Sequence, residues 1–292
     1  MEMSWRELID ELVVLKSEHV PVHFSRGYDP QAEILRKVAD NAYGYLGGFF
    51  QDRPELVLLV LSETDWMRCC PNQPYGNPFV PDIAVRYGVK PPESWKEHLV
   101  SLSTGAPQEF KENLIDVSGS ESGTVADAVN MIFTFEFFAP TLAHEFMHPF
   151  LSSNLVLPQP IGFRLGTKLD SFWLAEFLPQ YAMYSFLKRT DEGLCEKWQT
   201  LWTAAYEGGN ENVRYTALFE MGRKYPEMRE SCVENIFWYQ AKLFAMSADL
   251  YELHGEEFLI KAIDGLTLRD RLLFDRLDQA VGGFDCWLRN WK

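Results

Sequence analysis

The length, composition and charge of the chain indicate a well-packed globular protein. Its 292 residues are 47% hydrophobic and 14% aromatic, enough to bury the core of one large domain or of two lobes. The formal net charge of −15 argues against proteins that bind nucleic acids or anionic membranes through charge, because both partners would be repelled.

The first third of the chain predicts an α/β layer. Residues 1–20 have the acidic amphipathic pattern of a helix and lack the basic head and long apolar run of a secretory signal. Residues 20–25 alternate between apolar and polar side chains, as a half-buried strand does, and a helix is expected from residue 29 to about residue 50. Residues 55–62 are almost continuously apolar and predict a buried strand.

From residue 93 onward the pattern is mainly helical. Two short helices are expected first, over residues 93–100 and 107–115. The longer helices that follow are expected over residues 124–138, 140–152, 169–188, 194–207, 212–224, 228–254, 256–263 and 267–281. This order predicts an α+β protein in which an α/β subdomain, residues 1–154, precedes a helical subdomain, residues 155–292.

The cysteines and the hydropathy pattern bear on the cellular compartment. Cys69, Cys70, Cys195, Cys232 and Cys286 are odd in number and lack CxxC spacing, which indicates reduced thiols with no metal cluster. No segment approaches the roughly 20 apolar residues that a membrane span needs. We therefore expect a cytoplasmic protein.

Residues 140–149, Pro-Thr-Leu-Ala-His-Glu-Phe-Met-His-Pro, contain the sequence HExxH. On a helix, His144 and His148 lie one above the other on the same face, so both imidazoles can reach one metal ion. Glu145 then flanks that ion, about 100° round the helix axis. This is the arrangement of zinc hydrolases. The alternative is an amphipathic helix whose buried histidines are satisfied by hydrogen bonds.

A catalytic zinc site typically needs a third protein ligand, and Glu176 is the best candidate. It lies on the next long predicted helix, in the segment Phe172-Trp-Leu-Ala-Glu-Phe. A lone carboxylate on so apolar a helix would be costly without a partner, which favours a nearby cation. The segment Trp173-Leu-Ala-Glu resembles the WLNE segment of the gluzincins, zinc metallopeptidases whose third ligand is a Glu on the helix after HExxH.

The resemblance implies a fold and one more site residue. A gluzincin has a zincin-like fold, in which a small mixed-sheet lobe precedes a mainly helical lobe and the active site lies between them. The run that begins at Tyr239 resembles the gluzincin aminopeptidase segment whose Tyr hydroxyl donates a hydrogen bond to the oxyanion of the tetrahedral intermediate. An equally open alternative is a tyrosine that only packs between helices.

The sequence also departs from the family. Ala175 replaces the Asn of WLNE, and Pro149 directly after the second histidine predicts a restricted or kinked helix. Gln180 stands where thermolysin-like enzymes have the Asp that orients the first histidine. That partner is therefore Gln180 or a carboxylate elsewhere, with Asp170 one possibility. The GxMEN motif that reads a free amino terminus is missing, so aminopeptidase specificity is not expected.

Together these residues predict a zinc-dependent metallopeptidase acting on a peptide or protein substrate, with neither nucleic acid nor membrane as a partner. His144, His148 and Glu176 would hold the Zn²⁺. Glu145 would act as general base, and Tyr239 would stabilise the oxyanion. Two alternatives stay open: a catalytically silent zincin-fold protein that binds metal or a partner, and a metal-free helical interaction domain with an accidental HExxH.

Overall fold

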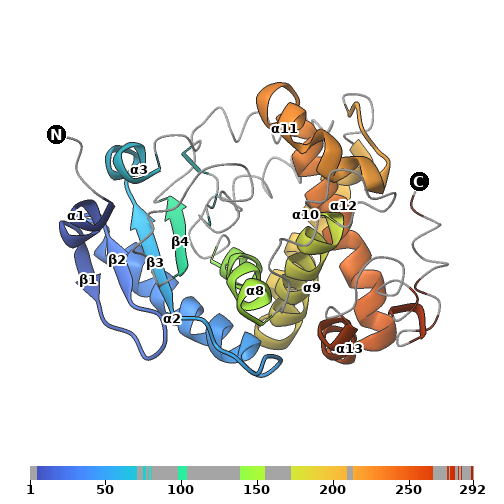
Figure 1. Ribbon diagram of the computed structural model, residues 1–292, viewed down its shortest axis with the longest axis horizontal. Helices are drawn as coiled ribbons and strands as arrows, with labels where there is room; N and C mark the ends of the chain where they lie inside the picture. Colours follow the sequence, from blue (N-terminus) through green and yellow to red (C-terminus); the bar gives the residue numbers. More distant parts are fainter. Residues whose placement is uncertain are drawn as a thin grey trace. The chain divides into compact units, whose positions relative to one another are not determined.

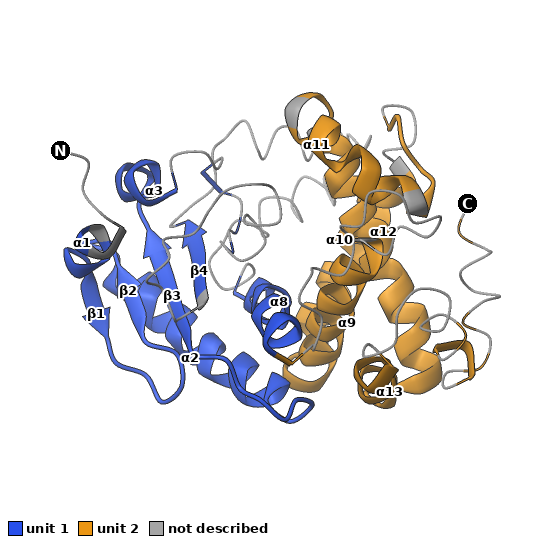
Figure 2. Ribbon diagram, viewed as in Figure 1, with its two compact units in different colours: residues 1–112, 130–153 blue, residues 113–129, 154–292 orange. Residues whose placement is uncertain are grey.

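The computed structural model describes residues 5–70, 98–103, 139–154, 172–208 and 213–265, with isolated positions after residues 70 and 265. These residues form a mixed α+β fold that is mostly helical, with a small four-stranded sheet (Figure 1). The chain divides into two compact units. The first unit comprises residues 1–112 and 130–153, and the second comprises residues 113–129 and 154–292 (Figure 2).

The first unit is built on a sheet with the strand order β1-β2-β3-β4. β3 (Leu56–Leu61) pairs in parallel with β2 (Val22–Phe24) on one side and with β4 (His98–Ser103) on the other, and β1 (Val13–Leu15) runs antiparallel to β2. All six residues of β3 are buried, as its continuous apolar sequence predicts. α2 (Asp29–Leu46) connects β2 to β3 and packs against both strands.

Two predictions for this unit are wrong in part. The helix expected over residues 1–20 is only α1 (Trp5–Asp10), because the valines and leucine of β1 pair with β2 instead. A helix is also expected over residues 93–100, yet β4 begins at His98 and pairs with β3. In both places, pairing with a strand elsewhere in the sequence outweighs the local helical pattern.

The described part of the second unit is helical and contains no strand, as predicted. Its central element is α12, which packs against α9, α10, α11 and α13. The elements in chain order are α9 (Phe172–Thr190), α10 (Glu192–Gly208), the short 3₁₀ helix η2 (Leu218–Glu220), α11 (Met221–Ser231), α12 (Val233–His254) and α13 (Glu257–Gly265).

The segment before η2 is not helical, contrary to the helix expected over residues 212–224. The buried side chain of Asn235 holds this segment on α12. Its Oδ1 accepts from the main-chain N–H of Arg214 at 2.9 Å and of Tyr215 at 3.3 Å, and its Nδ2 donates to the Tyr215 carbonyl at 2.6 Å. These bonds replace the helical ones that the segment lacks.

α12 is bounded by a non-helical residue at each end. Cys232, with φ of −151°, separates it from α11, so the helix expected over residues 228–254 is in fact two helices. At the other end, Gly255 leaves the helix with φ of 54° and ψ of −150°. The Gly255 carbonyl accepts a hydrogen bond from the Tyr181 hydroxyl of α9 at 2.7 Å, so this turn is tied to a second helix.

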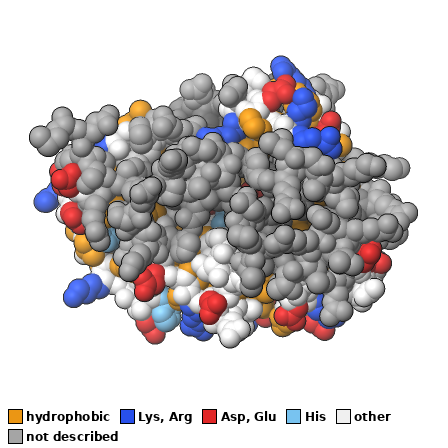
Figure 3. Space-filling model, viewed as in Figure 1, with side chains coloured by type: hydrophobic (Ala, Val, Ile, Leu, Met, Phe, Trp, Pro, Cys, Tyr) orange, Lys and Arg blue, Asp and Glu red, His pale blue; other side chains and the backbone are white. Residues whose placement is uncertain are grey.

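The remaining observations concern the helices, cysteines and surface charge of the described residues. No described helix combines the length and the apolar composition of a bilayer-crossing segment. The four described cysteines are buried and have free thiols. Acidic and basic side chains are interspersed over α11 (Figure 3). The helices expected over residues 107–115, 124–138 and 267–281 lie wholly or largely outside the described residues.

Candidate metal centre

α8 (Thr141–Asn154) carries the HExxH sequence and belongs to the first unit. A turn at Ala139 and Pro140 opens the helix, and the carbonyls of these two residues accept its first N–H bonds at 3.0 Å. Residues 142–151 are all buried, so the helix presents no solvent face over this length. Such a helix can exclude bulk water from the polar side chains that it carries.

Phe150 anchors α8 within the first unit. Its ring is fully buried and lies 5.3 Å from the ring of Tyr43 on α2. The ring of Phe50, just beyond the end of α2, is also 5.3 Å from the ring of Phe150. This aromatic cluster holds α8 in place at a point close to its own turns that carry the two histidines.

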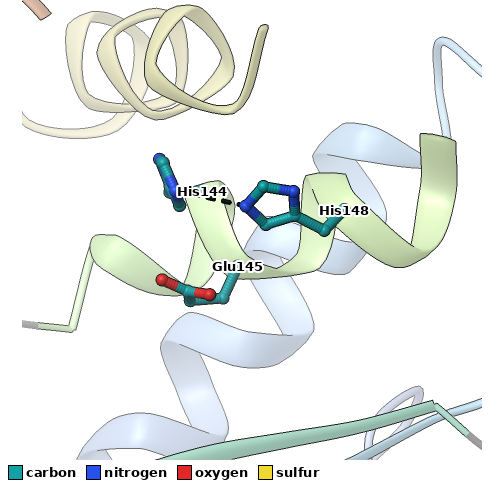
Figure 4. A group of neighbouring side chains, drawn as sticks. All are labelled: His144, Glu145 and His148. Carbon is teal, nitrogen blue, oxygen red and sulfur yellow. Dashed lines mark hydrogen bonds between the residues drawn. The ribbon is translucent and has the colours of Figure 1, made fainter. Parts of the chain in front are cut away.

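The imidazoles of His144 and His148 face one another from successive turns of α8 (Figure 4). Their Nε2 atoms are 3.3 Å apart, and the ring planes are inclined at 75°. The Glu145 carboxylate is set off from them around the helix, and the ligand atoms of all three residues lie within 4.8 Å of one another. The four-residue spacing of the histidines predicts this shared face.

This geometry fits a tetrahedral metal ion. Two nitrogens bound to zinc at about 2.0–2.1 Å, with a tetrahedral angle between them, would lie about 3.3–3.4 Å apart. The observed separation of 3.3 Å agrees with that distance. Burial lowers the pKa of His144 to about 3, so the imidazole is neutral at pH 7 and offers a lone pair to a metal. Imidazole nitrogens together with a carboxylate are donors that suit zinc.

A metal-free interpretation of the pair also has a physical basis. If one Nε2 carries a proton, it donates to the other Nε2, and the buried rings satisfy each other. The separation of 3.3 Å is longer than the about 2.7–3.2 Å usual for hydrogen bonds donated by N–H groups. The distance is therefore compatible both with two ligands of one ion and with a long hydrogen bond between the histidines.

Pro149 lies inside α8 without ending it. Because proline has no N–H, the helical bond that would reach the Glu145 carbonyl is not made. One turn later, the Ser152 hydroxyl donates to the carbonyl of His148 at 2.9 Å and to that of Pro149 at 3.3 Å. The helix nevertheless continues through the proline to Asn154.

Glu176, the predicted third ligand, lies on α9 in the second unit. Its side chain is only 7% exposed, and its Oε2 accepts a hydrogen bond from Gln240 Nε2 at 2.9 Å. This amide is a partner that the sequence did not indicate. The two histidines belong to the first unit, so their convergence with Glu176 on one ion stays a prediction.

Gln180 and Gln240 extend the polar group around Glu176. Gln180, predicted as one possible partner of the first histidine, is buried on α9, and its Nε2 donates to Gln240 Oε1. Sequence reasoning missed Gln240, whose signal is a polar side chain in the apolar run of residues 236–241. Asp170, the other possible partner, lies outside the described residues.

Tyr239, the predicted oxyanion donor, is fully buried on α12. Its hydroxyl donates to the Ala217 carbonyl at 2.7 Å, and its ring stacks on that of Trp291. Burial, with a smaller contribution from the charge of Glu220, raises the pKa of Tyr239 far above its ordinary value. The phenol is therefore neutral, and its single proton is donated to Ala217. An oxyanion role requires that the hydroxyl leave Ala217 and donate to the oxyanion instead, and this role stays a prediction.

The described residues thus contain two sets of candidate site residues. The first unit holds the histidine pair with Glu145, and the second holds Glu176 with its two glutamines. Comparisons of the chain with protein-family models, with curated proteins and with solved structures found no match.

Proposed function

We propose that this protein is a zinc-dependent metallopeptidase with a zincin-like fold, acting in the cytoplasm on a peptide or protein substrate. The observation that carries the proposal is the pair of imidazoles on α8. Their Nε2 atoms have the separation expected of two zinc ligands, and Glu145 lies beside them. The sequence adds Glu176 as the third ligand, and three protein ligands leave one position for water.

The roles of the residues follow from their chemistry. When bound, zinc supplies the positive charge that makes water more acidic and polarises a scissile carbonyl. Glu145 would accept the proton of the attacking water and pass it to the departing amine. The buried surroundings of α8 would strengthen these charge interactions by excluding bulk water. Tyr239 would hold the oxyanion after its hydroxyl leaves Ala217.

Metal analysis and a peptidase assay on the full chain, purified without chelator, test the proposal together. The wild type is expected to carry zinc and to hydrolyse peptides. Glu145→Gln should keep the zinc and lose turnover by about 10²–10⁴-fold, because the amide has the same shape but takes no proton. Glu63→Gln, exposed on α3 (Glu63–Cys69), is the matched control and should keep both properties. Native protein without stoichiometric metal would refute the proposal.

A catalytically silent protein that binds metal or a partner is the second candidate. The observation that favours it is the Tyr239 hydroxyl, whose proton is donated to Ala217. Wild-type protein that binds zinc but cleaves nothing in a broad peptide library would support this candidate. Protein that binds no metal would instead leave the hydrogen bond between His144 and His148 as the reason for their contact.

A further inference from the structure

The carboxylate of Glu176 belongs to a hydrogen-bonded chain with two glutamines of the second unit. Gln240 on α12 donates through Nε2 to Glu176 Oε2 at 2.9 Å, and its Oε1 accepts from Gln180 Nε2. Glu176 and Gln180 lie one turn apart on α9 and are 7% and 4% exposed. One amide from α12 therefore bridges two buried side chains of the neighbouring helix.

The donors and acceptors of this group agree with an ionised Glu176, the form that binds a metal ion. An ionised carboxylate only accepts hydrogen bonds, and the NH₂ end of Gln240 faces it. The carbonyl of Gln240 then faces Gln180, which must present its own NH₂ end. Gln180 Oε1 remains as a buried acceptor for which the described residues offer no donor.

Burial makes this orientation costly to change. If the Gln240 amide flipped, its carbonyl would lie against the Glu176 carboxylate, and the hydrogen bonds at both of its ends would be lost. The bond from Gln180 therefore keeps the donor of Gln240 aimed at Glu176. In metal sites, hydrogen bonds of this kind set the direction in which a carboxylate ligand is presented.

We propose that Gln240 is the positioning residue of Glu176: it holds the carboxylate in the orientation that binds the metal ion. This inference rests on the proposed zinc site. Gln240 acts through Glu176, to which it is bonded, and Gln180 fixes the Gln240 amide.

The test is the zinc affinity of the full-length protein, measured with Zn²⁺ alone by competition against a chromophoric chelator. Gln240→Met removes the donor while keeping the length of the side chain, and it is expected to weaken zinc binding roughly 10-fold or more. Gln199→Met, at an exposed glutamine on α10 of the same unit, is the matched control and should keep the wild-type affinity.

A double variant separates positioning from a general effect on the fold. In a Glu176→Gln background, where the two imidazoles give residual binding, Gln240→Met should add no further loss, because its effect passes through that carboxylate. A purely structural role would make the two losses additive.

The outcomes distinguish this inference from the proposed function. Wild-type affinity in Gln240→Met, or additive losses in the double variant, would overturn the role of Gln240 and leave the metallopeptidase proposal standing. Undiminished affinity in Glu176→Gln would remove Glu176 from the site, and Gln240 with it. Wild-type protein that binds no Zn²⁺ would overturn both proposals. If circular dichroism shows that Gln240→Met does not fold, Gln240→Leu takes its place. That variant has no donor or acceptor, so weaker binding is again expected and equal binding refutes the role.

Discussion

Replacing Tyr239 with Phe separates the two interpretations of this residue. Its hydroxyl donates to the Ala217 carbonyl at 2.7 Å from a fully buried ring. The Ala217 carbonyl also accepts a hydrogen bond from the Glu220 N–H at 2.9 Å, so it keeps a partner once the hydroxyl is gone. The expected cost is then the net value of one hydrogen bond, about 1 kcal/mol of unfolding free energy. We expect Tyr239→Phe to lose that much stability and to keep its zinc affinity. Its peptidase turnover should fall by about 10²–10³-fold, because the proposed oxyanion donor is gone.

Urea denaturation followed by tryptophan fluorescence measures this change, with zinc titration and peptide hydrolysis on the same samples. Tyr181→Phe is the matched control, because its hydroxyl also donates to a main-chain carbonyl, that of Gly255, at 2.7 Å in the same unit. The two variants should lose similar stability. A Tyr239→Phe protein that loses this stability but keeps wild-type turnover would refute the oxyanion role and leave Tyr239 as a residue that only packs between helices.

Two further predictions concern packing in each unit. Phe150→Ala should lower the unfolding free energy of the protein by about 3–5 kcal/mol in the same urea assay, because its ring is fully buried between two other rings. Met67→Ala, at a side chain that is 55% exposed, is its control, and a loss no larger than the control's would contradict the packing described. Asn235→Ala should cost about 2 kcal/mol, because three hydrogen bonds to the main chain disappear. Amide hydrogen exchange of residues 213–217 should accelerate, and unchanged protection would show that Asn235 does not hold them.

The sequence predicts best those features whose pattern is local. The continuous apolar run of β3 and the alternation around β2 are enough to predict both strands, because the burial of a strand follows its side-chain order. The spacing of His144 and His148 likewise predicts that the two rings share one face of a helix, and their Nε2 contact confirms it. The α+β class follows from the same local patterns.

The features that the sequence did not predict depend on partners distant in the chain. β1 and β4 form because β2 and β3 offer them hydrogen-bonding edges, which a helical pattern in either segment does not reveal. The bond between Gln240 and Glu176 joins residues 64 positions apart, and neither neighbourhood carries a sign of the other. A residue that supports a candidate ligand from another helix becomes visible only once the helices are packed.

The turn at Gly255 shows that tolerance to substitution is not a matter of room alone. A Cβ placed there would meet nothing within 4 Å, yet few side-chain-bearing residues adopt its dihedral angles. The restriction comes from the backbone dihedral angles, so the free space around the Cβ position does not reveal it. The Gly255 carbonyl accepts the hydrogen bond from Tyr181, which lies on α9 with Glu176. A substitution that changes the conformation of this turn would therefore also disturb the helix that carries Glu176.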